Sequence, residues 1–157
     1  MNLYTHFPDT RHDKEVIVVA AGHSFDGRYR HAYLAWCNGQ YPYRTHPTAP
    51  YQNVYQIVQL AQKSDGTYYY ADKYAERRTE QSESANQKFS LDTFSSKERQ
   101  AILRLAGQVQ FARKSKVNGC RTWLHDLLVA MHDAELITEE KLEELKEGVP
   151  LPERLPE

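Results

Sequence analysis

The chain contains the stretch Tyr29-Arg-His-Ala-Tyr-Leu-Ala-Trp-Cys37, which decides the fold more than any other segment. Its apolar residues alternate, so that Ala32, Leu34 and Trp36 share one face of a strand while the other face carries polar and aromatic side chains. The run Val16-Ile-Val-Val-Ala-Ala21 comes before it and is β-branched and apolar, as is typical of a buried strand. The two segments predict neighbouring strands of a sheet.

The segments that follow extend this sheet. Asn38-Gly39 is a typical hairpin sequence and predicts that the chain returns through Tyr41 to His46. Residues 51–62 fit a helix about as well as a strand, and we predict a strand because a turn sequence follows. The segment Thr67–Tyr70 is rich in strand-forming residues, whereas Glu76–Gln87 has no apolar face and predicts an exposed loop.

The second half of the chain predicts helices. Ser95 and Glu98 form a capping box at the start of a helix expected over residues 96–113. A second helix begins at about Cys120 and carries one apolar stripe as far as Ala134. A short acidic third helix is expected to stop at Gly148, with Thr138 as its cap.

Length and composition fit one domain. The chain has 157 residues, within the ~100–200 residues that a single core usually serves. Its mean hydropathy of -0.76 and its 11 tyrosines indicate a small core built partly from amphipathic aromatic residues. The prediction is an N-terminal arm (1–15), one α+β domain (16–148) and a Pro-rich tail (149–157). The domain is expected to hold a small, mostly antiparallel sheet over residues 16–75, followed by two packed helices and a short third.

The N-terminal sequence and the number of cysteines predict the cellular compartment of the protein. Met1–Pro8 lacks the basic region and apolar stretch of a secretory signal, and the longest apolar run, Val16–Ala21, is far below the ~18 residues of a membrane span. The two cysteines, Cys37 and Cys120, do not form a disulfide framework. We therefore expect a cytoplasmic protein without a membrane span.

Cys120 stands where a cysteine can act as a nucleophile. The first turn of a helix presents unpaired N–H groups and a partial positive charge, both of which favour a thiolate, and Arg121 adds a formal charge. Gly119 has no side chain, so a substrate carbonyl can approach and backbone N–H groups can form an oxyanion hole. By position alone, however, such a cysteine is more often a small buried residue of an apolar stripe.

A thiolate also needs a base, and His31 is the candidate. We expect it in the middle of its strand, where Tyr29 and Tyr33 make its face less apolar than the opposite one, so that these residues can line a cleft. His46, on the strand that returns from the predicted hairpin, can hydrogen-bond to His31 and orient it. Either histidine can instead be structural, half exposed or bonded to the backbone.

Three motifs occur in a fixed order, namely His31-Ala-Tyr-Leu-Ala-Trp36, Tyr43-Arg-Thr-His46 and Asn118-Gly-Cys-Arg-Thr-Trp123. This order resembles the permuted papain-like fold of lecithin:retinol acyltransferase-like and NlpC-type proteins, in which the histidine strand precedes the nucleophile helix. The likeness covers about residues 16–137. The motif that follows Gly119 is also similar to an uncharacterised fungal branch of this superfamily.

The resemblance implies a role for each matching residue. Cys120 would be the nucleophile, His31 the general base and His46 the polar partner of the imidazole, while Trp123 would pack the nucleophile helix onto the sheet. The implied activity is that of a cysteine-dependent acyl hydrolase or acyltransferase. It would act on an amide, thioester or ester bond of a small-molecule, lipid or peptide substrate, without a cofactor. The alternative is a non-catalytic binding module of the same fold.

Other function classes have weaker support. His125 and His132 lie two turns apart on one predicted helix, ~10 Å along its axis, too far for both to bind one zinc ion, so we expect no metal. The segment Lys97–Arg121 carries seven basic residues and one acid and could face nucleic acid, although the net charge of the whole chain is -1. The helix after it carries Asp126 and Asp133, which would repel a polyanion. Nucleic-acid binding is therefore an unfavoured alternative.

A protein-interaction module is a further alternative. Tyr68–Tyr70 and the acidic segment Glu139–Glu147 could present an aromatic surface with a charged rim to a partner. A half-buried sheet exposes such tyrosines routinely, so this feature does not by itself indicate a partner.

Overall fold

The structure, a computed structural model, describes residues 1–21, 31–42, 51–78 and 83–157. The strands are β1 (Lys14–Ala21), β2 (Ala32–Pro42), β3 (Tyr51–Val58), β4 (Leu60–Gln62), β5 (Tyr68–Tyr70), β6 (Ala75–Arg77) and β7 (Asn86–Phe94). The long helices are α2 (Ser96–Gln108), α3 (Cys120–Asp133) and α4 (Glu139–Gly148). Five strands form an antiparallel sheet in the order β6-β3-β2-β1-β7, and β4 pairs with β5 in a second, two-stranded sheet. The architecture is α+β, as predicted.

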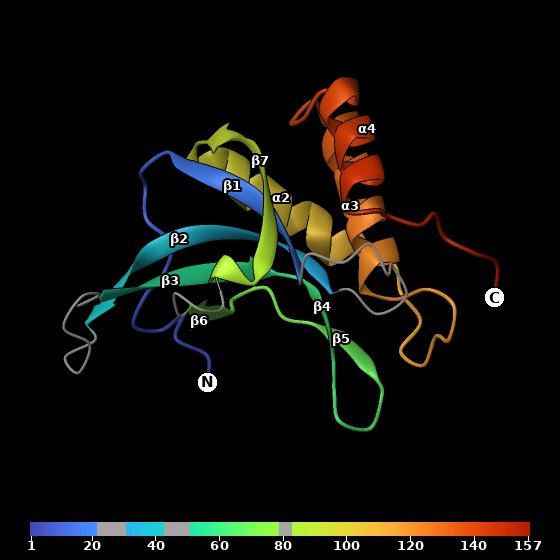
Figure 1. Cartoon of the computed structure of the whole chain (residues 1–157), viewed down its shortest axis with the longest axis horizontal. Coiled ribbons are helices and arrows are strands. Elements are labelled where there is room, and N and C mark those ends of the chain that lie inside the picture. The colour runs from blue at the N-terminus through green and yellow to red at the C-terminus, as the bar shows by residue number, and fades with distance from the viewer. Residues whose placement is uncertain (22–30, 43–50, 79–82) are drawn as a thin grey trace.

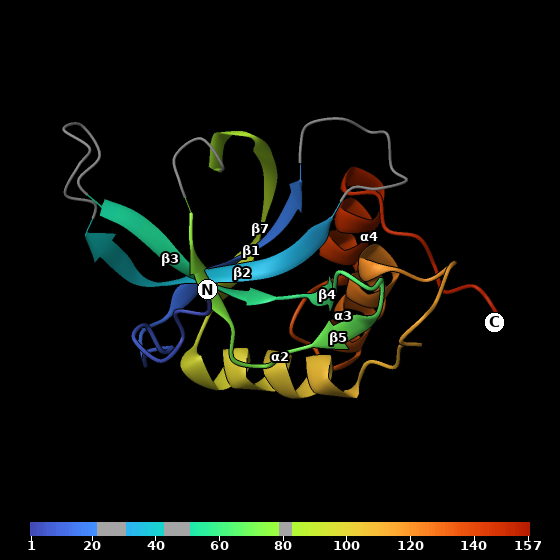
Figure 2. The same ribbon diagram turned by 90° about the horizontal axis from the view of Figure 1, so that it is seen from below.

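The helices lie on one side and at one end of the large sheet. Helix α2 crosses one face of the sheet, and α3 stands at the end where β2 begins, with α4 packed beside it (Figures 1 and 2). The predicted alternation in β2 is confirmed, because Ala32, Leu34 and Trp36 all lie in the main core that this face forms with the helices. The opposite face holds a smaller apolar cluster that includes Tyr33 and Ala35.

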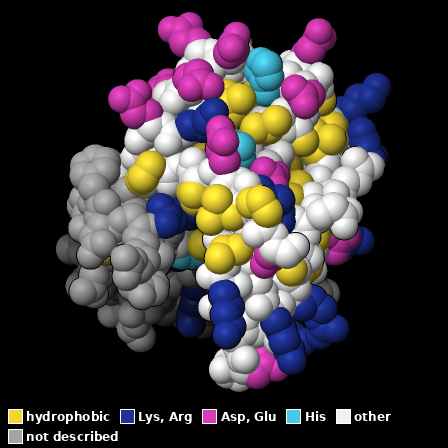
Figure 3. Space-filling view, turned by 90° about the vertical axis from the view of Figure 1, so that its right-hand side faces the viewer, with side chains coloured by type: hydrophobic (Ala, Val, Ile, Leu, Met, Phe, Trp, Pro, Cys, Tyr) yellow, Lys and Arg dark blue, Asp and Glu magenta, His cyan; other side chains and the backbone are white. Residues whose placement is uncertain are grey.

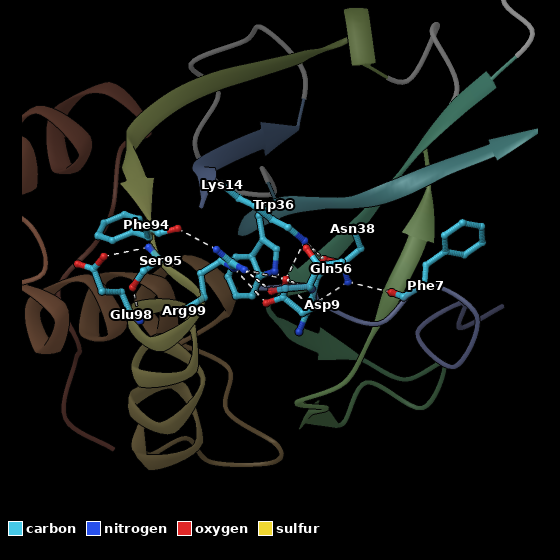
Figure 4. A network of polar contacts seen from close by, with 11 residues as sticks. Phe7, Asp9, Lys14, Trp36, Asn38, Gln56, Phe94, Ser95, Glu98 and Arg99 are labelled. Atoms are coloured by element: carbon cyan, nitrogen blue, oxygen red, sulfur yellow. Dashed lines mark hydrogen bonds and ion pairs between the residues drawn. The ribbon is translucent and has the colours of Figure 1, made fainter. Parts of the chain in front are cut away.

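A buried ion pair attaches α2 to the N-terminal arm (Figure 4). The guanidinium of Arg99 is fully buried and donates to both carboxylate oxygens of Asp9 at 3.0 Å. It also donates to the carbonyl oxygens of Phe94 and Thr10 at 2.8 Å. Burial by itself raises the pKa of Asp9, but hydrogen bonds from Arg99 and Lys14 and their positive charges lower it below its ordinary value. The arm is therefore part of the folded domain.

The Asn38-Gly39 pair, predicted as a hairpin turn, lies inside β2, and that prediction is wrong. The side chain of Asn38 is buried, where it donates to the carbonyl of Phe7 at 2.9 Å and accepts from Lys14 at 3.1 Å. Its amide also reaches Gln56 on β3 (Figure 4). Since the register of β2 against β3 shifts at this point, the pair forms a bulge and the strand continues to Pro42. The predicted return to His46 falls on residues 43–50, outside the described part of the chain.

The sheet extends beyond the predicted limit of residue 75. Within 76–87, expected to be a loop, Glu76 and Arg77 belong to β6 and the last two residues begin β7. Strands β6 and β7 are the two outer strands of this sheet. An outer strand keeps one polar edge and many polar side chains, so neither has the continuous apolar sequence of β1. Residues 51–62 are strand, as predicted, with a break at Gln59 between β3 and β4.

The helix predictions agree with the structure except at one end. The capping box of Ser95 and Glu98 is present, and α3 and α4 begin where their sequences predicted. Helix α2 ends at Gln108 rather than at residue 113, because the backbone of Val109 is extended. None of the helices in the described ranges is both long and apolar enough to cross a membrane.

Candidate active site

Cys120 is the first residue of α3, and its sulfur faces His31. Gly119 is the N-cap and offers no side chain to the helix, so the N–H groups of the first turn are not capped from that residue. Burial by itself raises the pKa of the Cys120 thiol. The hydrogen bond and charge of His31, the backbone N–H of Ala32 and the charge of Arg121 together lower it below its ordinary value. The surroundings of the sulfur therefore favour a thiolate.

His31 lies immediately before β2, at the end of the sheet, and not in the middle of a strand as predicted. Its backbone carbonyl accepts a hydrogen bond from Ala21 at 2.8 Å, which fixes this residue to the end of β1. Burial lowers the pKa of the imidazole, but the hydrogen bond and charge of Cys120 and a hydrogen bond with Gln59 raise it above its ordinary value. The two pKa shifts thus have the directions that favour a thiolate–imidazolium pair.

Gln59 is the third member of this arrangement, and the sequence interpretation missed it. Its side-chain oxygen lies 2.7 Å from Nε2 of His31 and accepts the proton of that nitrogen, so Nδ1 is the ring nitrogen available to the sulfur. The register of β2 against β3 explains the position of Gln59. Leu34 pairs with Val58, so Gln59, the residue after Val58, lies beside the start of β2. The available signal was a glutamine between two buried apolar residues, Val58 and Leu60, on the strand after the histidine.

Tyr68 on β5 brings a hydroxyl to the same place. Its oxygen lies 3.2 Å from the position that a Cβ atom on Gly119 would occupy, so the missing side chain of Gly119 makes room for this hydroxyl. Burial and the negative charge of Cys120 raise the pKa of Tyr68, which keeps the phenol protonated and able to donate. The amide of Tyr68 donates to the carbonyl of Arg113 at 2.8 Å and fixes β5 against the loop before α3.

These residues open onto a cavity of about 660 Å³. His31 and Cys120 lie in its wall together with Gly119 and Tyr68. The remaining lining comes from β4, the loop before α3, the first turn of α3 and the C-terminal tail, and consists of Leu60, Gln62, Ser115, Lys116, Val117, Arg121, Thr122 and Pro152. A volume of several hundred Å³ is typical of sites for small molecules. The sulfur is thus accessible from a pocket and is not sealed in the core.

The structure places the other predicted site residues around this pocket or away from it. Arg121 lines the pocket and donates to the carbonyl of Pro150 at 3.1 Å. Asn118 is buried and exchanges two hydrogen bonds of 2.8 Å with the backbone of Leu155, which holds the tail against the loop before α3. Trp123 is buried in the main core, with its ring centre 5.4 Å from that of Tyr70.

Of the remaining predicted site residues, Tyr33 lies outside the pocket wall, and two fall outside the described part of the chain. Tyr33 belongs to the smaller apolar cluster under the guanidinium of Arg78, where burial raises its pKa to about 12. Its ring contacts that of His31, with 5.5 Å between ring centres, but Tyr33 is not among the residues of the pocket wall. Tyr29 and His46 fall outside the described residues, so the roles proposed for them stay predictions.

The titratable residues elsewhere do not gather into a metal site. Within the described ranges there is no group of three or more His, Cys, Asp or Glu side chains that could hold a metal ion. His125 is buried, and its Nδ1 lies 3.1 Å from Asp126. His132 lies nearer the end of the same helix, beside Asp133 at 3.6 Å.

Comparisons with known proteins gave no relative. No protein-family model, no curated protein and no solved structure matches the chain. What the site can do therefore has to be argued from its own geometry.

Proposed function

We propose that this protein is a cysteine-dependent acyl hydrolase or acyltransferase, with Cys120 as nucleophile and His31 as general acid and base. The observation that carries the proposal is the chain of contacts from the sulfur of Cys120 through the imidazole of His31 to Gln59, at the wall of an open pocket. A nucleophile bonded to a base that a third polar group orients is the arrangement that covalent acyl transfer requires. The order of these residues along the chain also supports the resemblance to the permuted papain-like superfamily.

In the first half of the reaction, the thiolate of Cys120 attacks the carbonyl carbon of the substrate. A C–S bond forms, and the π electrons of the carbonyl move to its oxygen. When this oxyanion collapses, the bond to the leaving group breaks and the leaving group takes the proton of the His31 imidazolium. The product of this half is a thioester on Cys120.

In the second half, water or an acceptor alcohol or amine attacks the thioester. His31, now neutral, accepts the proton of the attacking group, and the C–S bond breaks to release the acyl product and the thiolate. The hydrogen bond from Nε2 of His31 to Gln59 keeps the ring in one tautomer and one orientation through both halves. The thiolate–imidazolium pair is thereby restored.

The oxyanion is assigned two donors. One is the backbone N–H of Cys120 in the first turn of α3, where the helix dipole also favours negative charge. The other is the hydroxyl of Tyr68, which lies over Gly119 and lines the pocket. Both come from regular elements whose positions the fold fixes, as such a site needs.

The test compares the two cysteines of the same chain. We expect Cys120 to react with iodoacetamide at pH 6 much faster than Cys37, whose thiol donates to the carbonyl of Gly39 at 3.4 Å and has no histidine beside it among the described residues. The labelled peptides are separated and quantified by mass spectrometry. In His31→Ala the preference for Cys120 should disappear, whereas His132→Ala, the matched control at the other end of α3, should retain it.

Acylation is tested with p-nitrophenyl acetate. We expect a burst of p-nitrophenolate and a mass increase of one acetyl group on the peptide that contains Cys120. Equal and slow alkylation of both cysteines, together with no acetylated Cys120, would refute the proposal. Fast, His31-dependent alkylation without any acylation would refute catalysis as well and leave a binding module with a reactive thiol. Circular dichroism of His31→Ala, and of His31→Gln as a second variant, shows whether each is folded.

A further inference from the structure

The described residues of the pocket wall include basic but no acidic side chains. Among the described residues that line it, the side chains with a permanent charge are Lys116 and Arg121, and none is Asp or Glu. When the pair of Cys120 and His31 is ionised, the thiolate and the imidazolium cancel in net charge, so the net positive charge of the described wall comes from Lys116 and Arg121. A ligand in this pocket therefore meets a positive potential from these two side chains.

No carboxylate in the described part of the chain neutralises these two residues. Neither Lys116 nor Arg121 forms an ion pair with a described Asp or Glu. Arg121 is held by its hydrogen bond to the carbonyl of Pro150, and Lys116 is exposed at the pocket wall. The nearby carboxylate of Glu157 accepts hydrogen bonds from Ser115 and Asn118 and does not line the pocket. The positive charge is thus available to a ligand.

The surface outside the pocket also carries acidic and basic side chains in different places. On the face that Figure 3 shows, acidic side chains gather at the top, over α4, and basic side chains gather on the lower part. The acidic residues of α4 include Glu139, Glu140, Glu143, Glu144 and Glu147. This division steers an anion away from α4 and toward the lower part of the face.

From this arrangement we infer that the pocket selects an acyl donor that carries a negative charge, a carboxylate or a phosphate, near the reacting carbonyl. The inference rests on the proposed function and names its substrate class. Lys116 and Arg121 bind the charged group, and Cys120 attacks the carbonyl beside it. A neutral acyl donor lacks this attraction and binds more weakly.

Alkylation of Cys120 with a charged and a neutral reagent tests the inference without a known substrate. Iodoacetate and iodoacetamide react with the same sulfur, so the ratio of their rates cancels any change in thiolate reactivity and reports the local potential. We expect the ratio of the iodoacetate rate to the iodoacetamide rate at Cys120 to exceed the ratio for the neutral thiol N-acetylcysteine amide and to fall as ionic strength rises. Lys116→Glu should lower it about fourfold, the effect of a two-unit change of charge at roughly 10 Å in water.

Lys114→Glu is the matched control, because it makes the same change of net charge in the same loop but does not line the pocket. It should leave most of the preference for iodoacetate in place. If Lys114→Glu and Lys116→Glu lower the ratio equally, the general field of the protein is responsible, and the inference is overturned. A ratio at Cys120 equal to that of N-acetylcysteine amide overturns it too.

Two esters extend the test to acyl transfer. The enzyme should show a lower KM for the monoanionic p-nitrophenyl glutarate than for the neutral p-nitrophenyl butyrate, and Lys116→Glu should reduce this difference. Protection of Cys120 from iodoacetamide by glutarate or by inorganic phosphate then distinguishes a carboxylate from a phosphate ligand, and protection by neither refutes anion binding. The failures are distinguishable, because a reactive, acylated Cys120 without charge preference contradicts only this inference.

Discussion

Gln59→Ala tests whether the hydrogen bond to His31 keeps the imidazole protonated beside the sulfur of Cys120. The substitution removes the oxygen that lies 2.7 Å from Nε2 of His31. A hydrogen bond to a charged group is worth ~1.5–3 kcal/mol. Because Gln59 is half-buried and water can replace part of this interaction, we expect a loss of about 1 kcal/mol. This loss corresponds to about a fivefold decrease in the population of the thiolate–imidazolium pair on the basic side of its pH range, where the imidazolium loses its proton.

The direction follows from the two pKa shifts. In the native protein the pKa of Cys120 is lowered and that of His31 is raised, so both shifts favour the ion pair. Without Gln59 the imidazolium is less stable, so the pKa of His31 falls. The acidic limb, where Cys120 loses its proton beside an imidazolium, should stay in place because Gln59 stabilises that imidazolium before and after the proton leaves. The pH range of the ion pair should therefore narrow from its basic end.

The assay is the rate of iodoacetamide alkylation of Cys120 between pH 4 and 9, together with the pH profile of p-nitrophenyl acetate hydrolysis. Gln62→Ala is the matched control, because Gln62 also lines the pocket but donates to the carbonyl of Gly66 and not to His31. An unchanged basic limb of the hydrolysis profile in Gln59→Ala, or an equal shift in both variants, would refute the role assigned to Gln59.

Three further predictions concern the oxyanion donor and the buried ion pair. Tyr68→Phe should lower the rate of acylation by about tenfold to a hundredfold with little change in KM, and an unchanged rate would exclude the hydroxyl as a donor. Gly119→Ala should slow acylation to a similar extent, because the added Cβ displaces the Tyr68 hydroxyl. The free energy of unfolding, measured by urea denaturation, should fall by less than about 1 kcal/mol. An acylation rate equal to that of the native protein would contradict this contact. Asp9→Asn should lower the free energy of unfolding at pH 7 by about 3 kcal/mol, since it leaves the buried charge of Arg99 without its partner. The pKa of Asp9 is lowered in the folded protein, so this contribution is present above its ordinary pKa of 3.8 and is lost as the pH falls through the folded-state pKa; an equally acid-sensitive Asn variant would refute the assignment.

Local patterns in the sequence predicted the elements that depend on local physics. The alternation around Leu34, the capping box at Ser95 and the start of α3 at Cys120 each follow from a few neighbouring residues, and the structure has all three. The strand β7 could not be recognised in this way, because its polar residues suit an outer strand only when β1 is already beside it. Asn38-Gly39 has the composition of a turn, and only its buried partners on other segments show that it lies inside a strand.

The residues of the candidate site also differ in how far the sequence could predict them. Cys120 and His31 belong to residue types whose chemistry is visible in a sequence, so both were found and the structure brings them together. Gln59 and Tyr68 are ordinary polar and aromatic residues, and their importance depends on strand register and on the space above Gly119. His46, the polar partner that the resemblance implies, lies outside the described residues, and Gln59 is the described side chain that bonds to the imidazole.

The ion pair between Arg99 and Asp9 has a consequence for the order in which the chain folds. Its two residues are separated by 90 positions, and the guanidinium loses its water only when the N-terminal arm arrives. Helix α2 has its own capping box, whereas the contact with the arm joins segments far apart in the sequence and closes a long loop. We therefore expect the arm to dock late in folding, and amide hydrogen exchange in α2 should accelerate in any variant whose arm is detached.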